Sequence, residues 1–124
     1  MGPEAVIVGH TDENPDIENL VTLVERGAWI QLDTIGKQNY IPDEERAGLV
    51  ADIKDRGLLG RLLLSQDLNR KPNLAKYGGP GYSDLIKRFL PMLKEKGITD
   101  EDIHTITVDN PSIALRIRRD PGTV

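Results

Sequence analysis

Three ionisable side chains follow three short apolar segments of the sequence, and their types suit metal-assisted or acid–base chemistry. His10 follows a strand predicted at residues 5–8, while Asp33 and Asp67 end strands predicted at residues 28–33 and 61–67. A neutral imidazole and a carboxylate are suitable ligands for a divalent metal of the zinc type, and either group can transfer protons. A polar residue at a strand end can also cap a nearby turn, and that interpretation stays open for each of the three.

Helices predicted between and after these strands must position the three side chains. Capping residues, prolines and apolar spacing indicate where the helices begin and end. The predicted helices run from Asn14-Pro15 to Gly27, from Pro42 to Gly57, from about Tyr82 to Gly97, and from a capping box at Thr99 and Asp102 to about Val108, with a last helical turn starting at Asn110-Pro111.

The order of these elements indicates the fold class. Strands alternate with helices and no hairpin signal joins two strands, which predicts an α/β protein with a parallel sheet and right-handed crossovers. A doubly wound sheet and a (β/α)8 barrel both fit this pattern. Neither GxGxxG nor GxxxxGK[ST] follows a strand, so a nucleotide-binding site of those two kinds lacks its phosphate-binding loop.

Side-chain alternation predicts which strand residues share a face with the candidate site. Counting back from His10 places Val8 and Val6 on its face, and counting back from Asp67 adds Leu63. With helices on one side of the sheet only, these apolar side chains would be bare to water. Such a face calls for a partner.

Composition excludes several other classes of protein. The chain has 124 residues, a formal charge of −4 and no cysteine, which excludes a disulfide scaffold, a thiolate zinc site and a cysteine nucleophile. The acidic balance argues against nucleic-acid binding. No apolar run approaches the roughly 18 residues of a spanning helix, and no signal peptide is evident. These features predict a cytoplasmic protein with no membrane partner.

Several ordered motifs carry a resemblance to a known family. The segments GHTDENPDIENL, GAWIQLDTIGKQNYIPDEERAGLVADIKDRGLLGRLLLSQD and KYGGPGYSDLIKRFLPMLKEKGI resemble the phosphotriesterase family of the amidohydrolase superfamily, and in particular its branch of phosphotriesterase homology proteins. The resemblance extends from Glu4 to Leu115. It implies that residues 1–115 are the last three strands of a TIM (β/α)8 barrel with their helices, a partial barrel, and that residues 116–124 are a tail.

The resemblance also implies a metal-dependent hydrolase with a binuclear centre, usually of Zn²⁺. In this family the sixth strand supplies a His ligand and the eighth an Asp ligand, and these correspond to His10 and Asp67. The expected chemistry is hydrolysis of an ester, lactone or phosphotriester by metal-activated water, in which Asp67 also takes or relays the proton. The family's other ligands, on its first, fourth and fifth strands, have no counterpart in this sequence.

One departure and one group of loop residues bear on the substrate. Efficient organophosphate hydrolases of the family carry a His directly after the seventh-strand Asp, where this chain has Thr34, so the sequence favours lactone or ester hydrolysis. Some relatives hold the phosphate of phosphorylated lactones with basic and Tyr side chains. The candidates for substrate binding, chosen by placement, are Lys37, Arg70, Lys71 and Tyr77; solvated loop charge is the alternative interpretation.

Three functional hypotheses remain open from the sequence. The first is part of a hydrolase, active only with the N-terminal half of the barrel, because two protein ligands are too few for a tight catalytic metal site. The second is an inactive half-barrel remnant that self-associates as a homo-oligomer or binds a partner. The third is an open α/β binding module without a metal.

Overall fold

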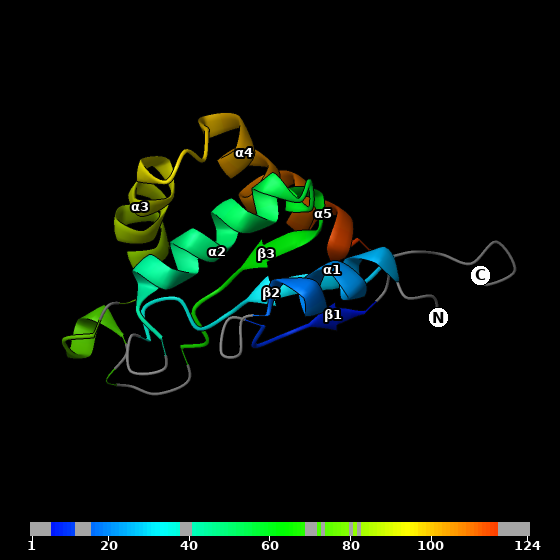
Figure 1. Cartoon of the computed structure of the whole chain (residues 1–124). Coiled ribbons are helices and arrows are strands. Elements are labelled where there is room, and N and C mark those ends of the chain that lie inside the picture. The colour runs from blue at the N-terminus through cyan, green and yellow to red at the C-terminus, as the bar shows by residue number, and fades with distance from the viewer. Residues whose placement is uncertain are drawn as a thin grey trace, which may run out of the picture.

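Three short strands form one parallel sheet (Figure 1). The computed structural model describes residues 6–11, 16–37, 41–68, 72, 74–79, 81 and 83–116. The strands are β1 (Ile7–Val8), β2 (Trp29–Leu32) and β3 (Leu62–Leu64), in the order β1-β2-β3. Both neighbouring pairs are parallel. The predicted α/β class with a parallel sheet is confirmed, although each strand is shorter than its apolar segment suggested.

Helical segments follow each strand in the chain. Helix α1 (Ile17–Glu25) follows β1, and α2 (Asp43–Asp55) follows β2. The remaining segments are η2 (Leu59–Arg61), η4 (Ala75–Tyr77), η5 (Leu85–Phe89), α3 (Leu90–Glu95), α4 (Asp100–His104), η6 (Thr105–Asp109) and α5 (Asn110–Ala114). The predicted capping box at Thr99 and Asp102 is present, with both of its hydrogen bonds.

The first helix begins later than the sequence predicted. Asn14 and Pro15, where a start was expected, lie outside the described residues. Helix α1 begins at Ile17, and Asp16 is its N-cap, with a carboxylate oxygen that accepts the backbone N–H of Glu18 at 3.1 Å. A carboxylate at this position satisfies a backbone donor of the first turn, so Asp16 serves as the cap that Asn14 was expected to provide.

Helix α5 begins at Asn110, where the sequence predicted a last helical turn, and it continues directly from η6. The backbone N–H of Asn110 donates to the carbonyl of Thr105, five residues earlier, so the helix continues through one wide turn. Such π-type turns accommodate a local break in the regular ladder, here beside a proline that has no N–H to donate. The Asn110 side chain instead donates to the carbonyls of Leu59 and Leu62, at 2.7 and 2.8 Å.

Strand register corrects the predicted faces of the sheet. Val8 pairs with Ile30 and Ile30 with Leu62, and residues that pair across a sheet share a face. Ile30 and Leu62 pack into the helical core, so Val8 lies on the helix side and not on the opposite face with Leu63. The alternation count failed because His10 has left the strand, with a φ of 55°.

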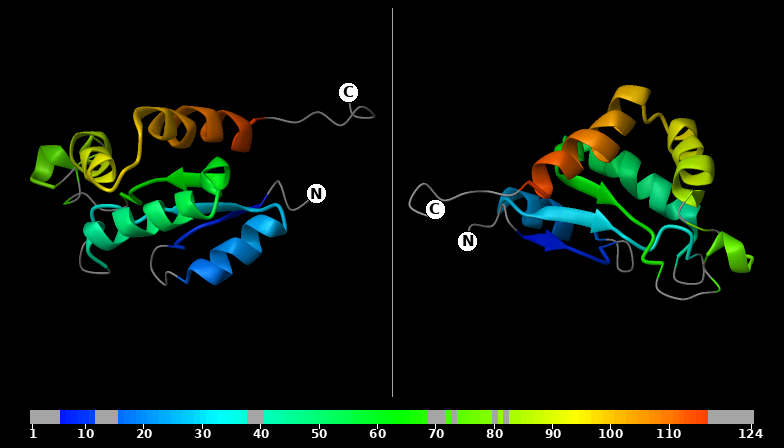
Figure 2. Two further views of the ribbon diagram at one scale, coloured as in Figure 1. Left: turned by 45° about the horizontal axis from the view of Figure 1, so that its top comes forward. Right: turned by 180° about the vertical axis from the view of Figure 1, so that it is seen from behind.

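The opposite face of the sheet carries Ile7, Trp29, Gln31 and Leu63, as the register requires. Viewed from behind, the three strands lie in front of α1 and α2 (Figure 2, right). Leu63 is nevertheless 6% exposed and Trp29 2%, and the guanidinium of Arg61 lies 4.8 Å from the centre of the Trp29 ring. The expectation that Leu63 is bare to water was therefore wrong.

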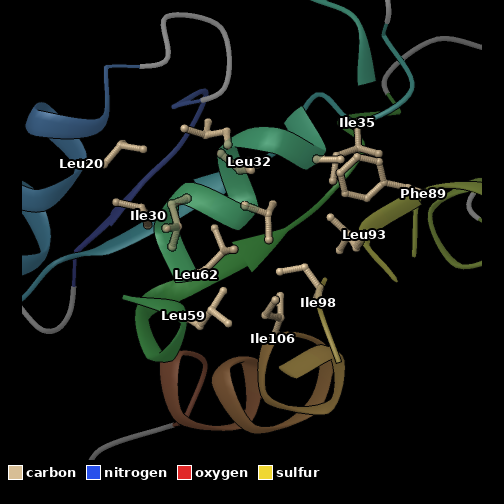
Figure 3. Packing of buried hydrophobic residues seen from close by; sticks show 14 residues of the cluster. Leu20, Ile30, Leu32, Ile35, Leu59, Leu62, Phe89, Leu93, Ile98 and Ile106 are labelled. Atoms are coloured by element: carbon tan, nitrogen blue, oxygen red, sulfur yellow. The ribbon is translucent and has the colours of Figure 1, made fainter. Parts of the chain in front are cut away.

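One apolar core lies between the sheet and the helices (Figure 3). It joins Ile30, Leu32 and Leu62 of the strands to Phe89 and Ile106 of the later helical segments. These segments are far apart in sequence, so burial of their side chains holds the three strand–helix units together. Among the described residues, the helices are too short or too polar to cross a membrane.

Candidate functional site

The first element of the site is a contact between His10 and Asp33. Nδ1 of His10 lies 2.6 Å from Oδ1 of Asp33, and the backbone N–H of His10 donates to the same oxygen at 2.9 Å. A carboxylate only accepts hydrogen bonds, so Nδ1 carries the hydrogen and Nε2 is the electron-pair donor of the neutral ring. The pair joins the carboxyl end of β1 to that of β2.

The absence of a side chain at Gly9 allows the Asp33 carboxylate to approach the main chain next to His10. A Cβ at Gly9 would lie 2.8 Å from Oδ2 of Asp33, closer than two such atoms can approach. The Asp33 side chain is 14% exposed and that of His10 is 54% exposed. Asp33 is thus seated against the main chain before His10, and the imidazole extends from it towards solvent.

The second element is an ion pair between Lys37 and Asp67. Nζ of Lys37 lies 3.2 Å from Oδ2 of Asp67, and this pair joins the carboxyl end of β2 to that of β3. The Lys37 side chain is 15% exposed and that of Asp67 is 39% exposed. The ammonium is therefore more buried than the carboxylate it contacts, and part of Asp67 remains accessible from outside.

Both predicted metal ligands have an unusual backbone conformation. Among the described residues other than glycine, only His10 and Asp67 have positive φ angles, 55° and 49°. This conformation is disfavoured for side chains with a Cβ, and it persists where the surrounding structure requires a particular side-chain direction. The two residues that were predicted as metal ligands are thus the two that the fold holds in a strained backbone conformation.

Neighbouring strand-end loops are tied to the sheet by backbone hydrogen bonds. Thr11 donates to the carbonyl of Gln31 through its N–H, at 3.3 Å, and its hydroxyl, at 2.7 Å. The N–H of Ile35 donates to the carbonyl of Ser65 at 3.2 Å. The carboxyl ends of the three strands lie at the same end of the sheet, where parallel (β/α) proteins build their sites (Figure 2).

The arrangement fits a metal site only in part. Nε2 of His10 and the Asp67 carboxylate are a donor set suited to a divalent ion of the zinc type. Within the described parts of the chain, however, no group of three His, Asp or Glu side chains could hold a metal ion. A metal site that used His10 and Asp67 would therefore need at least one further ligand from outside the described residues.

The predicted substrate-binding residues have different outcomes. Lys37 lies beside Asp67, as described above. Tyr77, in η4, is 53% exposed with its ring 5.8 Å from Nζ of Lys76, and it is not part of either pair. Arg70 and Lys71 lie outside the described residues. Of the two described candidates, the structure thus brings Lys37 but not Tyr77 to the strand-end site.

A cluster of charged side chains supports the loop that carries Lys37. This charge cluster consists of Asp43 and Arg46 of α2 together with Asp84 and Arg88. Asp43 accepts from Arg46 at 2.7 Å, from Arg88, and from the backbone N–H of Gly36 at 3.0 Å. Arg88 also donates to Asp84, and the cluster thereby links α2 to the helical segment after β3.

The charge cluster shifts the pKa of two of its members. Burial acts to raise the pKa of Asp43, but hydrogen bonds from Gly36, Arg88 and Arg46 together hold it below the ordinary value of 3.8. The hydrogen bond to Asp84 is the main cause of a raised pKa at Arg88, with a further contribution from Asp43. Both groups are therefore charged across the ordinary range of pH.

Sequence reasoning missed the supporting roles of three residues. Asp33 was named as a strand-end acid that could bind a metal or transfer protons, but not as the partner of His10. Gln66 is 5% exposed and donates through Nε2 to the carbonyl of Gly81 at 2.8 Å, which ties the long loop after β3 to the strand end. Arg46 stood in a helix and carried no signal of burial. Polar residues at strand ends were the available signal for Asp33 and Gln66.

Comparison with known protein families assigns the chain to a family. The model of the phosphotriesterase family matches residues 4–115. The chain belongs to the phosphotriesterase family. This is a family of metal-dependent hydrolases, and the membership confirms the resemblance found in the sequence.

Named relatives agree with the family assignment. The chain is 40% identical over 107 residues to the phosphotriesterase homology protein of Escherichia coli (strain K12), and 33% identical over 117 residues to a phosphotriesterase-related protein of Drosophila persimilis. The matches cover 86% of this chain in each case, but 37% and 33% of those two proteins. The chain thus spans about a third of the length of the curated relatives it matches.

Solved structures give the same result for the fold. The phosphotriesterase homology protein of Escherichia coli, solved with phosphate in its active site, superposes with a TM-score of 0.91 at 37% identity, over 94% of this chain and 40% of that one. A lactonase from Listeria monocytogenes has a TM-score of 0.89 at 27% identity, over 96% and 38%. The sheet and its helices are therefore a partial TIM barrel, as predicted.

Proposed function

We propose that this chain forms the late-strand part of a metal-dependent hydrolase that acts on an ester, lactone or phosphotriester. The observation that carries the proposal is the pair of strained strand-end residues, His10 and Asp67, each held by a neighbour of opposite or complementary charge. Family membership supports the reaction class. The small coverage of the relatives makes activity a property of the chain together with the remaining barrel strands.

Nε2 of His10 and the carboxylate of Asp67 are the groups we expect to hold zinc. Zinc held by these groups would supply metal-activated water, with its pKa lowered to about 7, and would polarise the substrate oxygen. Asp33 keeps Nε2 of His10 available by accepting the hydrogen on Nδ1. We expect the carboxylate of Asp67, whose side chain is 39% exposed, to take the proton of the attacking water.

Lys37 is the described side chain best placed to recognise the substrate. Its ammonium lies at the strand-end site and is mostly buried, so a negative group there would be bound in a partly desolvated setting. Arg70, Lys71 and Tyr77 stay candidates for the same role. Our preferred substrate is a lactone that carries an anionic group for Lys37 to bind. A lactone is preferred to a phosphotriester because Thr34 stands where the efficient organophosphate hydrolases of the family have a His. The Thr34 side chain is fully buried and accepts a hydrogen bond from Arg46.

Complementation and zinc content test the proposal together. The chain would be mixed with a polypeptide containing the first five strands of a family barrel, and bound zinc and lactone hydrolysis would be measured. We expect little tightly bound zinc in the chain alone, and both zinc and activity in the mixture. His10→Ala and Asp67→Ala should each remove them.

Matched control variants are available outside the site. His104 and Asp109 form a similar His–Asp pair on an exposed helical surface, with Nδ1 and Oδ2 3.5 Å apart. His104→Ala and Asp109→Ala should therefore leave zinc and activity unchanged. Unaltered zinc content in the His10→Ala mixture would refute the assignment, and a folded complex with zinc but no hydrolysis would refute the reaction.

The alternative function is an inactive half-barrel that self-associates. The exposed apolar residues Val6, just before the edge strand β1, and Ile7, its first residue, favour this candidate, being 44% and 36% exposed. A homo-oligomer without bound zinc, and without activity in any mixture, would support it over the hydrolase. Cytoplasmic location stays a prediction for either function.

A further inference from the structure

Arg46 is a fully buried arginine whose hydrogen bonds converge on one loop. Nη1 donates to the carbonyl of Ile41 at 2.8 Å and to Oδ1 of Asp43 at 2.7 Å. Nη2 donates to Oγ1 of Thr34 at 3.0 Å and to the carbonyl of Lys37 at 3.2 Å. A planar guanidinium can bind several acceptors in fixed directions, so Arg46 joins the start, middle and end of the loop between β2 and α2.

The guanidinium of Arg46 is itself fixed in place. Asp43 is fully buried and accepts hydrogen bonds from Arg46, from Arg88 and from the backbone N–H of Gly36. Gly36 has a φ of 92°, and a Cβ there would lie 3.3 Å from Oδ2 of Asp84. The loop backbone is thus pressed against the charge cluster and has little room to shift relative to Arg46.

Lys37 is the residue through which this support reaches the strand-end site. Its carbonyl accepts from Arg46, and its N–H donates to the carbonyl of Thr34 at 2.9 Å. Its side chain ends 3.2 Å from Oδ2 of Asp67. The backbone of Lys37 is therefore held on both sides, which limits the positions that its ammonium can reach.

We propose that Arg46 is a positioning residue that sets the ammonium of Lys37 against the carboxylate of Asp67. Without the guanidinium, the Lys37 carbonyl and the Thr34 hydroxyl lose their shared donor, and the loop gains alternative conformations. Lys37 then spends less time at Asp67. The consequence for hydrolysis rests on the proposed function, but the placement of Lys37 does not.

Lysine acetylation in the full chain tests the placement without metal or substrate. Site-by-site rates would be measured by mass spectrometry for the unaltered chain and for Arg46→Met. We expect Lys37 to react about tenfold faster in the variant, since hydrogen bonds to charged groups are worth a factor of this order. Lys54 lies in the last turn of α2, away from the loop, and is held by Asp102 at 2.7 Å, so it should react at an unchanged rate.

Two further variants separate positioning from general stability. Ile53→Ala leaves a cavity in the core beside α2, away from the loop. It should change the acetylation rates of Lys37 and Lys54 by similar factors. Arg46→Lys keeps the charge but not the planar group, so it should not restore slow reaction at Lys37. Equal acceleration at both lysines in Arg46→Met, or full rescue by Arg46→Lys, would overturn the proposal.

Thr34→Val serves if Arg46→Met does not fold. It removes one acceptor of Arg46 and keeps the ion pair with Asp43, so a smaller acceleration confined to Lys37 is expected. No acceleration at Lys37 in a folded Thr34→Val chain would also count against the proposal. A selective effect at Lys37 combined with failed complementation would uphold the positioning role and reject the hydrolase function.

Discussion

At the scale of single residues, the site depends on how partners orient the two candidate ligands. His10 and Asp67 have the residue types that a zinc-type centre needs, but an imidazole binds metal only through a nitrogen that carries no hydrogen. Asp33 decides which nitrogen that is, by accepting from Nδ1 at 2.6 Å. Gly9 allows this carboxylate to approach the main chain. Residue types thus indicate the chemistry, and contacts direct it.

Replacement of Asp33 should weaken the metal site without unfolding the protein. In Asp33→Asn the amide no longer offers a negative charge to the imidazole, so His10 becomes a poorer ligand. We expect zinc affinity of the complemented barrel to fall by about 10- to 100-fold, the usual effect of losing such a partner. Competition with a zinc-binding dye measures the affinity.

The matched control is Asp109→Asn, which changes the carboxylate beside the other histidine. That variant should bind zinc as the unaltered chain does, and thermal denaturation should verify that both variants are folded. Unchanged zinc affinity in Asp33→Asn would mean that the contact with His10 does not orient a ligand.

At the scale of elements, buried charges hold helix α2, the following helical segment and the loop after β2 in one arrangement. Asp43 and Arg46, near the start of α2, are both fully buried. A carboxylate with three donors around it can be buried because its charge and hydrogen-bond acceptors are satisfied. The loop that bears Lys37 depends on this arrangement.

The charge cluster predicts a loss of stability in acid. The pKa of Asp43 is lower in the folded chain than its ordinary value of 3.8. Its contribution to the free energy of unfolding is therefore complete above that value, and it is lost as the pH falls from there through the folded pKa. Urea denaturation at a series of pH values should follow this loss.

Asp43→Asn should flatten the acid dependence and lower stability at neutral pH. Removing one partner of a buried ion pair costs roughly 3–5 kcal/mol, because Arg46 would remain buried without its counter-charge. Glu44→Gln, at the exposed neighbouring position, should change neither quantity appreciably. An acid dependence in Asp43→Asn as steep as that of the unaltered chain would contradict this account.

At the scale of the whole molecule, a parallel sheet with helices on one side is an incomplete unit. Family barrels close their sheet, whereas β1 and β3 are the edge strands of the three-stranded sheet described here. Edge strands offer unpaired backbone groups and readily pair with other chains. The superposition on a solved relative agrees with this, because the chain matches it with a TM-score of 0.91 but covers only 40% of its length.

The edge of β1 should therefore promote self-association of the isolated chain. We expect sedimentation velocity to show association that increases with protein concentration. Val6→Lys places a charge beside this edge, where the unaltered side chain is 44% exposed, and should reduce association with little effect on thermal stability. The matched control is Val108→Lys, because Val108 lies on a helix and is similarly exposed, at 50%.

A result of equal association in Val6→Lys and the unaltered chain would show that another surface mediates it. A monomer at every concentration would contradict the expectation, and the hydrolase proposal would be unaffected because that proposal concerns the completed barrel.

Sequence order was sufficient to predict the α/β class, the parallel sheet, the approximate positions of the helices and the family. These depend on local periodicity, capping residues and ordered motifs, all of which are properties of short segments. His10 and Asp67 could be chosen for the same reason, since both follow recognisable strands. The start of α1 was missed, because neighbouring residues compete as caps.

Only the tertiary structure decided which side chains meet. The contacts of His10 with Asp33 and of Lys37 with Asp67 cross 23 and 30 residues of sequence. The burial of Arg46 and the face occupied by Val8 likewise follow from strand register and from packing between separate elements. Such contacts arise when distant segments bury their apolar surface together, and no local pattern encodes their geometry.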